Sequence, residues 1–484
     1  MKGVYFLILS IFCLVIPLKS QGVDKLTLAE VIVMAKGQSI AARQSITTRE
    51  TRFWEWKTFL SNYKPQLVLQ GNLPAFTRSF IEVIQPDGTI QFQPIRYNNS
   101  ALNLSLSQTV GQTGGQIYAT TQLQRFDDFN RNTVLYNSSP FAIGYRQPLF
   151  QFNPFKWDKK IEPLKFEESK QIFLESMEKI AIQSTKYFFN VLMAQVNVQI
   201  AETNLSNTSI ISNIAQEKYN LGKITKNEIL QLQLESLKAQ KAIANAKRDL
   251  EISWLNLRAY IGLQSDNRIE LEIPSRMIMA FISGEKALAE AFENRSDAIR
   301  YRRQILEAEQ NVAKAIGDNG LNATLTATLG FSNRGARIPE LYENPKRQES
   351  IQLELDIPIL DWGRSKSRTK TAEAEQKLTE YTIEQDRQNF KQEIHTQVTL
   401  FEMLRRELDI TTQTDSIASE KYKIAQDRYV LGFLSTTDLS IAFQEKDQAK
   451  RDHIKTLQDF WETYYWLRAL TLYDFEKNEK IKHD

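Results

Sequence analysis

Two short motifs recur in this chain at one common spacing, and this repetition constrains the fold more than any other feature of the sequence. Tyr219–Gly222 (YNLG) matches Tyr429–Gly432 (YVLG), and Arg146–Leu149 (RQPL) matches Asp356–Ile359 (DIPI), each pair separated by 210 positions. Self-similarity at a fixed offset is typical of a duplicated structural unit. We therefore predict two copies of one unit: a strand pair, a proline exit, a long helix, a glycine turn and a return helix.

The duplication divides the rest of the chain into four parts. We expect the first repeat at residues 21–264 and the second at 285–475, with a connector at 265–284 and a charged tail at 476–484. A duplicated unit gives pseudo-symmetry within one chain. Three chains would then supply six near-equivalent units around a ring.

Long stretches of the sequence carry apolar residues at the spacing of a helix. One stripe in the second repeat recurs every three or four residues: Phe390, Ile394, Val398, Phe401, Leu404 and Leu408. On this pattern we expect helices over the ranges 25–62, 164–217, 226–262, 285–317, 365–428 and 436–474. A helix of about 60 residues spans about 90 Å and needs a partner along its whole length, as in a coiled coil or a tube wall.

Alternating apolar and polar residues predict strands before each pair of long helices. In the second repeat, Leu321–Phe331 and Ser350–Ile357 each place apolar residues on one face and mainly polar residues on the other. The lipid-facing and lumen-facing sides of a membrane barrel have this period, and so does a half-buried hairpin of a water-soluble protein. The alternation therefore leaves both interpretations open.

The strand block of the first repeat is longer than that of the second. It covers residues 65–148, against 322–358 in the second repeat. The extra length contains strand-like segments near 80–93 and 117–126, with a tight-turn signal at Pro86–Gly88. These segments either form an external hairpin or add strands to the sheet, and the sequence does not separate the two possibilities.

The first twenty residues are typical of a secretory signal peptide. Lys2 precedes an apolar run from Val4 to Leu18, and a polar break follows near Ser20, where we expect cleavage. A membrane anchor helix is the alternative, but a run of about 15 residues is shorter than the roughly 20 that a bilayer span needs. Cys13, the only cysteine, lies inside this run, so we expect no disulfide in the mature chain.

Charge and composition argue against several classes of function. With 61 basic and 58 acidic residues the net charge is +3, which is too small for a nucleic-acid-binding surface. The three histidines, His395, His453 and His483, are far apart, and there is no metal-ligand spacing, nucleophile elbow or phosphate loop. We therefore expect no enzyme activity, cofactor or metal. After residue 20 no apolar stretch reaches 18 residues, so any membrane crossing would use strands closed into a barrel.

In the order and spacing of its motifs the chain resembles the TolC family of outer-membrane efflux and secretion proteins. The resemblance covers nearly all of the sequence after the signal peptide. The motifs that carry it are Tyr219–Gly222, Tyr260–Leu263, Tyr429–Gly432, the strand exits Gln147–Phe150 and Pro358–Gly363, and the charged, alanine-bearing tract Asn294–Ala315. Each motif alone is weak, but their order and spacing together are specific.

The resemblance implies an α+β membrane protein that forms a homotrimer in the outer membrane. Twelve strands, four from each chain, would form one β-barrel in outer-membrane lipid, and the helices would continue it as a long tunnel across the periplasm. A periplasmic adaptor protein and an inner-membrane transporter of the RND or ABC class would dock at the helical tips. The channel would conduct substrates passively from that transporter to the outside.

Two other functions are compatible with these sequence features. Within the channel class, the chain would serve as the duct of a type I protein secretion system if its cargo is protein. Outside that class, the long helices also permit an exported coiled-coil structural or adhesion protein. That hypothesis gives no reason for two alternating hairpins that lead into long helices at a fixed offset.

The resemblance also implies where the pore narrows. The acidic gate positions of the family follow the second glycine turn and fall here on Asp438, which matches, and on Ile441, which does not. The corresponding residues of the first repeat are Glu228 and Gln231. Residues three apart share a helix face, so three copies of Asp438 would form an acidic ring and three of Ile441 an apolar ring. Alternatively, Asp438 only serves the first turn of its helix, near the favourable end of the helix dipole.

Two further kinds of site follow from the resemblance. The glycine turns, at Leu221, Gly222, Leu431 and Gly432, are expected to be the adaptor-docking tips, although each glycine also suits an ordinary helix end. Trp157 and Trp362 follow the strand exits and are expected at the membrane interface, where aromatic rings are favoured. Packing at the junction between barrel and helices is the alternative role for both tryptophans.

Overall fold

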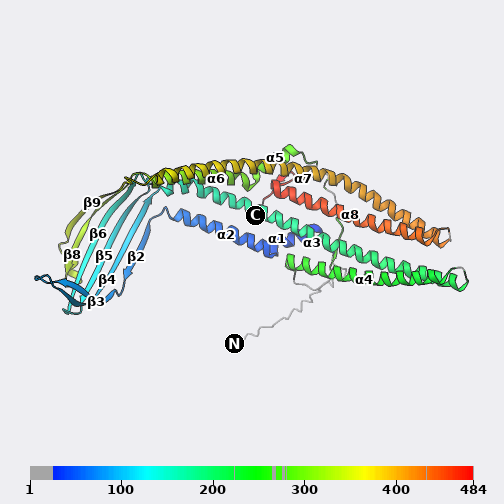
Figure 1. The fold of residues 1–484 in the computed structure, drawn as a ribbon, viewed down its shortest axis with the longest axis horizontal. Coiled ribbons are helices and arrows are strands. Elements are labelled where there is room, and N and C mark those ends of the chain that lie inside the picture. Colours follow the sequence, from blue (N-terminus) through cyan, green and yellow to red (C-terminus); the bar gives the residue numbers. More distant parts are fainter. Residues whose placement is uncertain are drawn as a thin grey trace, which may run out of the picture.

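The computed structural model describes residues 25–222, 224–263, 269–274, 278, 281–431 and 433–482. The molecule is elongated, with a sheet at one end, two helical hairpins at the other and the C-terminus near the middle (Figure 1). The expected signal peptide at residues 1–20 and the predicted tip residue Gly432 lie outside the described residues. Within the described part of the chain, no helix is both long enough and apolar enough to cross a membrane.

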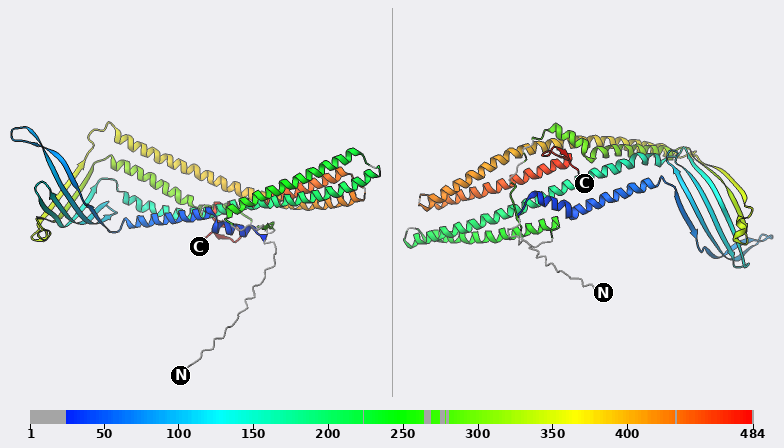
Figure 2. Two further views of the ribbon diagram at one scale, coloured as in Figure 1. Left: turned by 90° about the horizontal axis from the view of Figure 1, so that it is seen from below. Right: turned by 180° about the vertical axis from the view of Figure 1, so that it is seen from behind.

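The two halves of the chain form long helices of equal length at a constant offset. The first of each half, α3 (Pro154–Asn220) and α7 (Arg364–Val430), has 67 residues, and the second, α4 (Lys226–Ile261) and α8 (Thr436–Thr471), has 36. Paired helices start and end 210 positions apart, as the sequence motifs do. Both hairpins turn at the same end of the molecule (Figures 1 and 2). The predicted internal repeat is therefore confirmed.

Two stretches expected as single helices are each divided in the structure. The four resulting helices are α1 (Leu28–Gln38), α2 (Ile40–Ser61), α5 (Gly284–Asn294) and α6 (Ser296–Asp318). The breaks fall at Ser39 and Arg295, whose backbones are extended with ψ of 155° and 156°. Ser39 accepts a hydrogen bond from the Ala42 amide at 3.0 Å, and this cap starts a new helix where the periodicity alone predicts continuation.

The helix α3 begins at Pro154, earlier than the expected start near residue 164, and it contains Pro163. A proline inside a helix removes one backbone hydrogen bond. Neighbouring helices hold these first turns, since Trp56 of α2 stacks on Phe166 with ring centroids 5.5 Å apart. Packing against neighbours thus outweighs the local signal of the proline.

The large sheet is antiparallel and lies beyond the ends of α2, α3, α6 and α7 (Figure 1). Its strands are β2 (Gln66–Asn72), β3 (Phe76–Ile84), β4 (Ile90–Val110), β5 (Gly115–Asp128), β6 (Thr133–Leu149), β8 (Asn322–Gly335) and β9 (Lys346–Asp356). They are ordered β2-β4-β5-β6-β8-β9, with β3 beside the part of β4 that lies farther from the helices. A short 3-10 helix, η1 (Ile338–Tyr342), lies in the turn between β8 and β9.

The number of strands differs from the four per chain that the resemblance implies. Seven strands form one sheet and occupy six positions across it, because β2 and β3 both pair with β4. This is possible because β4 has 21 residues and pairs with β2 over one part and β3 over another. The segment 117–126 lies in β5, inside the sheet, whereas 80–93 belongs to the β3–β4 hairpin. The sequence left open whether these segments form an external hairpin or add strands to the sheet. The segment 80–93 forms a hairpin, and the segment 117–126 adds a strand.

Two short pairings fasten the ends of the described chain to the middle of the molecule. The strand β1 (Lys25–Leu26) runs parallel to β7 (Glu270–Leu271), which lies within the run 269–273 expected to be β-like. Near the other end, β10 (Tyr473–Asp474) pairs with β11 (Glu479–Lys480). Both pairings therefore lie beside the main hydrophobic core.

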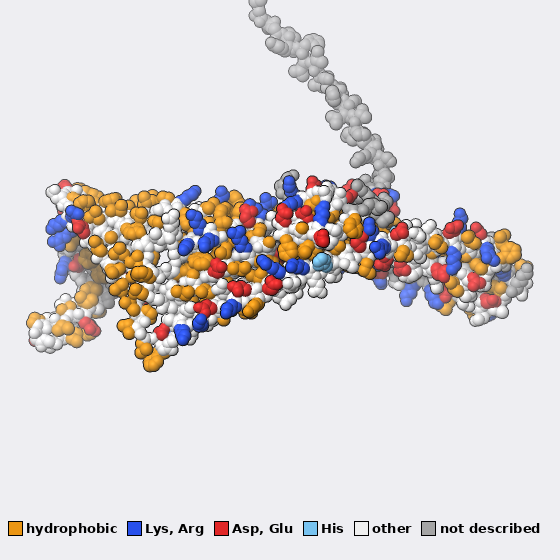
Figure 3. Space-filling model, turned by 90° about the horizontal axis from the view of Figure 1, so that it is seen from above, with side chains coloured by type: hydrophobic (Ala, Val, Ile, Leu, Met, Phe, Trp, Pro, Cys, Tyr) orange, Lys and Arg blue, Asp and Glu red, His pale blue; other side chains and the backbone are white. Residues whose placement is uncertain are grey.

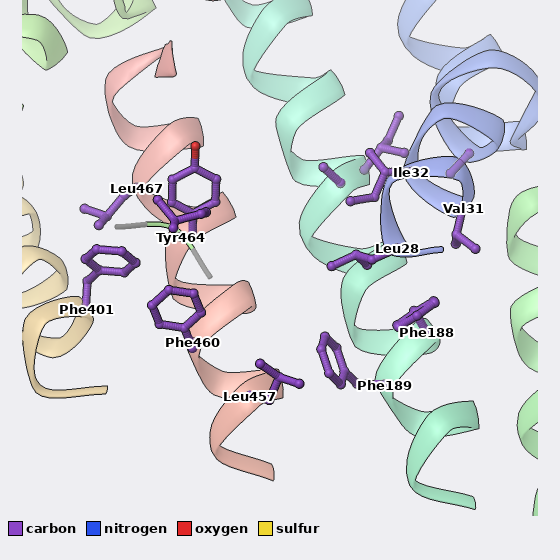
Figure 4. Close-up of a cluster of buried hydrophobic side chains, with 14 of the residues drawn as sticks. Leu28, Val31, Ile32, Phe188, Phe189, Phe401, Leu457, Phe460, Tyr464 and Leu467 are labelled. Carbon is purple, nitrogen blue, oxygen red and sulfur yellow. The ribbon is translucent and has the colours of Figure 1, made fainter. Parts of the chain in front are cut away.

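The main core fills the middle of the molecule, where α1, α3, α7 and α8 meet (Figure 4). Phe401 of α7 stacks on Phe460 of α8 with ring centroids 5.0 Å apart. Phe188 and Phe189 of α3 are fully buried, Phe188 on the side of Leu28 of α1 and Phe189 on the side of Leu457 of α8 (Figure 4). The predicted apolar stripe of α7 is buried throughout, from Phe390 to Leu408, and each such side chain stabilises the fold by roughly 1.5–3 kcal/mol.

Two buried glutamates of α3 pair with cations from other helices. The Glu178 side chain is only 1% exposed and lies 2.6 Å from Lys36 of α1 and 2.9 Å from Arg468 of α8. Nearer to the sheet, Glu168 accepts hydrogen bonds from Arg303 of α6. A buried carboxylate is strongly unfavourable without such partners, so these pairs help to select which helices pack on α3.

Candidate functional site

The large sheet has one apolar face across its whole width. The register between strands places on this face Leu67 and Leu69 of β2, Leu104 and Leu106 of β4, Ile117 of β5, Ile143 of β6, Leu329 of β8, and Leu353 and Leu355 of β9. Their exposed fractions run from 37% at Leu104 to 66% at Leu67. Hydrophobic side chains gather visibly over the sheet in Figure 3. An apolar surface of this extent requires an apolar environment or a partner.

The opposite face of the sheet carries mainly hydroxyl and amide side chains. Among them are Ser105 and Ser107 of β4, Thr120 and Gln122 of β5, Thr326 and Thr328 of β8, and Ser350 and Gln352 of β9, with Arg146 and Glu354 as charged residues. Tyr118 of β5 crosses β6 on this face at Gly144, and its hydroxyl lies 2.9 Å from that of Thr328. This face is suited to contact with water.

Both edges of the sheet are open in a single chain. Among the described residues, β2 pairs only with β4, and β9 pairs only with β8. All residues of both edge strands are exposed. An edge strand presents a row of unpaired backbone donors and acceptors, which makes it a template for pairing with another strand.

Apolar exposure continues at the junction between the sheet and the helices. Trp362 is 90% exposed in the turn before α7. Asp361 fixes this turn by accepting hydrogen bonds from the backbone amides of Gly363 at 3.0 Å and Ser365 at 2.8 Å. Trp157, near the start of α3, is partly buried. Both tryptophans thus lie at the junction, but only Trp362 projects fully from the surface.

The tips of the two helical hairpins carry exposed apolar side chains. Leu221 and Leu431 are each 69% exposed. Gly222 has a left-handed backbone with φ of 70°, which explains the glycine at this helix end, whereas Gly432 lies outside the described residues. Phe433, which we did not predict, is 73% exposed at the second tip. The sequence signal for it is an aromatic residue directly after a glycine turn.

Asp438 and Glu228 each bond to the N-cap residue of the helix on which they lie, Ser435 for α8 and Thr225 for α4. Ser435 donates a hydrogen bond to Asp438 Oδ2 at 2.6 Å and accepts one from the Asp438 amide at 3.2 Å. Thr225 and Glu228 form a reciprocal capping box. The backbone and side-chain hydrogen bonds from Thr225 lower the pKa of Glu228. Both carboxylates remain exposed, so the cap leaves them accessible from solvent.

The other two predicted constriction residues, Ile441 and Gln231, are exposed on α8 and α4. Ile441 is 48% exposed, whereas Leu439 and Ala442 are buried in a small cluster with Tyr429 of α7. The helix α8 therefore turns its Leu439 side toward α7 and leaves Ile441 outside that contact. The four predicted residues lie on two separate hairpins, and the described residues hold no group of ligands that suits a metal ion.

Sequence reasoning did not identify the groove where the two hairpins meet. It has a volume of about 700 Å³ and lies between α3, α4 and α8. Within it, Asn207 Nδ2 donates to Tyr422 Oη at 2.6 Å, and Asn204 Nδ2 donates to Asp447 Oδ2 at 3.3 Å. These contacts join α3 to α7 and α8. The sequence gives little sign of them, because asparagines on a helix are mostly solvated.

Comparison with known proteins agrees with this architecture. The model of the family described as outer membrane efflux protein matches residues 95–263 and 320–471. These two ranges include the strand blocks and long helices of both repeats. Comparison with curated protein sequences finds no match.

Several solved structures share the fold. The Campylobacter jejuni CmeC outer membrane channel matches with a TM-score of 0.68 and 14% identity, over 94% of this chain and 87% of that chain. The outer membrane protein VceC of Vibrio cholerae matches with a TM-score of 0.63 and 14% identity, over 94% and 97% of the two chains. The open state of the Neisseria gonorrhoeae MtrE outer membrane channel matches with 0.62 and 15%, over 94% and 90%.

Proposed function

Because the chain belongs to the outer membrane efflux protein family, we propose that it is the outer-membrane channel subunit of a tripartite efflux pump. In this role it conducts substrates passively from an inner-membrane transporter to the outside. The sheet lies in the outer membrane and the helices extend into the periplasm. The chain acts as a duct and carries out no chemical reaction.

A sheet with two different faces and two open edges carries this proposal. Its apolar face suits lipid and its hydroxyl- and amide-rich face suits a water-filled lumen. Unpaired backbone groups at a lipid-exposed edge cost several kcal/mol each. Pairing β9 of one copy with β2 of the next satisfies both edges and closes the sheets into one barrel.

A homotrimer is the assembly that we propose. Each chain contributes six strand positions, so a closed trimer has eighteen positions in place of the twelve that the resemblance implies. The helices form the wall of a common tunnel below the barrel. At 1.5 Å per residue, each of α3 and α7 spans about 100 Å.

The partners in this proposal dock at the helical tips. The exposed side chains of Leu221, Leu431 and Phe433 form the surface for a periplasmic adaptor protein, because exposed apolar residues at a loop mark contact sites. An inner-membrane transporter of the RND or ABC class completes the pump. The pore narrows at the same end, where Asp438 provides an acidic ring and Ile441 an apolar ring.

Single-channel recording tests the proposed function directly. The mature protein, without its expected signal peptide, would be purified in detergent and reconstituted into planar bilayers. We expect discrete conductance steps, and a trimer by native mass spectrometry. Correctly inserted protein without conductance would favour the exported structural or adhesion protein instead.

Cross-linking tests how the sheet closes. Since Cys13 lies in the expected signal peptide and is the only cysteine, new cysteines can be introduced without a competing thiol. A variant with Leu69→Cys on β2 would be combined with cysteine at position 351, 353 or 355 of β9. We expect disulfide-linked trimers in at least one combination, and only monomers when either cysteine is present alone.

A further inference from the structure

The β3–β4 hairpin extends beyond the rest of the sheet, on the side away from the helices (Figures 1 and 2). Nine residues of β3 pair with Ile90–Asn98 of β4, and the turn at Pro86–Gly88 joins them. Within the described chain, β3 pairs on one side only. A two-stranded hairpin is at best marginally stable alone in water, so its surroundings must contribute to its stability.

The register shows which face of the hairpin continues the apolar face of the sheet. Leu102, Leu104 and Leu106 lie on the apolar face of β4, and side chains of one strand alternate between faces. The same face of β4 therefore carries Arg96. Its partner across β3 is Arg78, and the two are directly opposite each other.

Two like charges directly opposite on neighbouring strands destabilise a pair. Both arginines are exposed. Within the described residues neither forms an ion pair with an acidic side chain. The nearest carboxylate on this face of β5, that of Asp127, already accepts hydrogen bonds from Arg125 and Asn98. Glu82 lies on this face of β3 four residues beyond Arg78, opposite Phe92, which is about 13 Å along the strand and too far for an ion pair. Within the described residues, no carboxylate therefore pairs with the two arginines.

The arginine pair is surrounded by apolar and aromatic side chains. The guanidinium carbon of Arg96 lies 5.4 Å from the centroid of the Phe129 ring, and Phe76 lies 5.8 Å from the same ring. Farther along the hairpin, Phe80 and Phe92 are 69% and 61% exposed on this face. Aromatic rings beside cations are typical of the boundary between hydrocarbon and polar headgroups.

The position of the pair along the strands fits this boundary. A tilted barrel strand crosses the hydrocarbon in about 9–11 residues. Counted from Gln66, where β2 begins beside the helices, the crossing ends close to Phe76, the first residue of β3. Arg78 is two residues farther out and Arg96 lies opposite. Both arginines thus lie at the level of the headgroups of the outer leaflet.

We propose that Arg78 and Arg96 bind the phosphate groups of an anionic glycolipid in the outer leaflet, while Phe76, which lies on the hydrocarbon side of the pair, contacts its acyl chains. Guanidinium groups bind phosphate by paired, charge-assisted hydrogen bonds. One phosphate between the arginines removes their repulsion and anchors the hairpin on the membrane. This site rests on the proposed function, because that function sets the position of the membrane.

Lipid binding to the purified full-length protein tests the proposal. The probe is diphosphoryl lipid A, titrated into protein in a neutral detergent, with dephosphorylated lipid A and inorganic phosphate as comparison ligands. The test variant is Arg78→Gln with Arg96→Gln. The control variant, Arg52→Gln with Arg248→Gln, also removes two arginines, which are exposed on helices and already paired with Glu55 and Asp249.

We expect the wild type and the control variant to bind diphosphoryl lipid A alike, and the test variant to bind at least about tenfold more weakly. Equal binding of dephosphorylated lipid A, or unchanged binding by the test variant, overturns the site. Competition by inorganic phosphate alone at similar concentration shows a free-anion site and also overturns it. Loss of the trimer in the test variant identifies the hairpin as a contact between copies, which overturns it as well.

Planar-bilayer recordings on the same preparations separate this site from the proposed function. A conducting wild type that fails the lipid test overturns the site and leaves the channel intact. A wild type that never conducts but binds lipid through the two arginines overturns the channel and supports the site. We expect the test variant to conduct like the wild type, since both arginines face away from the lumen.

Discussion

The hydroxyl groups of Tyr118 and Thr328 lie 2.9 Å apart on the polar face of the sheet, and the two residues are 210 positions apart in the sequence. They therefore occupy equivalent places in the two repeats. Tyr118 reaches Thr328 by crossing β6 at Gly144, where a Cβ atom would lie 2.2 Å from Tyr118 Cζ. This contact joins the strands of one repeat to those of the other.

A methyl group at position 144 would collide with the Tyr118 ring. We expect Gly144→Ala to destabilise the folded protein by about 1–3 kcal/mol, the usual cost of overpacking. The measurement is the thermal unfolding of purified protein in detergent. In a Tyr118→Ala background the ring is absent, so we expect Gly144→Ala to cost less stability there than in the wild type. If the destabilisations of the two single variants simply add in the double variant, the Tyr118 ring is not what the methyl group collides with.

Neighbouring residues of β9 face opposite sides of the sheet and provide a matched test of membrane exposure. Leu353→Arg places a charge on the apolar face, where it costs about 2–4 kcal/mol at the centre of a bilayer. Gln352→Arg adds the same charge to the polar face, which is the lumen side in our proposal, so we expect it to insert normally. The measurement is the fraction of each variant that folds in lipid vesicles. Equal fractions would contradict the assignment of the two faces.

The buried contact between Glu178 and Arg468 joins α3 to α8. Replacing Arg468 with methionine leaves the buried Glu178 carboxylate with Lys36 still beside it, and it also removes the ion pair between Arg468 and Asp474. We expect a loss of about 3 kcal/mol in unfolding free energy. The control is Arg248→Met, because Arg248 pairs with Asp249 on the surface and such pairs contribute about 0–1 kcal/mol. Chemical denaturation of the two variants and the wild type provides the comparison.

The same network makes stability depend on acidic pH. Desolvation acts to raise the pKa of Glu178, but the charges of Lys36 and Arg468 outweigh it, and the pKa is lowered from its usual value of 4.5. The carboxylate therefore stabilises the fold fully above pH 4.5 and loses this contribution as pH falls through the lowered pKa. Thermal stability measured from pH 7 down to pH 3 should fall more steeply in the wild type than in Glu178→Gln.

Asp438 has a role in the helix cap and a proposed role in the pore, and two variants separate them. Ser435→Ala removes the cap but keeps the carboxylate, so we expect about 1 kcal/mol lower stability and unchanged ion selectivity. Asp438→Asn removes the charge, so we expect weaker cation selectivity of the channel. Reversal potentials in a salt gradient measure the selectivity. Identical reversal potentials for Asp438→Asn and the wild type would contradict a role of Asp438 in the pore and leave only its role in the helix cap.

The long helices were largely predictable because their signal is local and repeated many times. The apolar stripe from Phe390 to Leu408 predicted the buried face of α7. The motifs at Gly222 and Pro358 predicted the offset between the repeats. Breaks at Ser39 and Arg295 were not predicted. They depend on a single cap and on tertiary packing, which periodicity does not contain.

The sequence predicted that both blocks form strands, but not how many strands the sheet has. Alternation identified strands in both blocks, and the segments 80–93 and 117–126 were left open, yet the count of four strands per chain that the resemblance implies is lower than the seven of the sheet. Pairing between distant strands such as β6 and β8 fixes the sheet, and no local pattern encodes which strands pair. The groove contacts of Asn204 and Asn207 were missed for the same reason, since their partners are more than 200 residues away.

The two repeats match in their helices and differ in their strands, with four strand positions from the first and two from the second. In the proposed trimer, eighteen positions at ~4.8 Å spacing and a tilt near 40° would enclose a mouth about 36 Å across, against about 24 Å for twelve. A mouth of this width above a helical tunnel of unchanged width would give the proposed duct the profile of a funnel. Its electrical resistance would then reside almost wholly in the shaft, and substitutions around the mouth would scarcely alter the current.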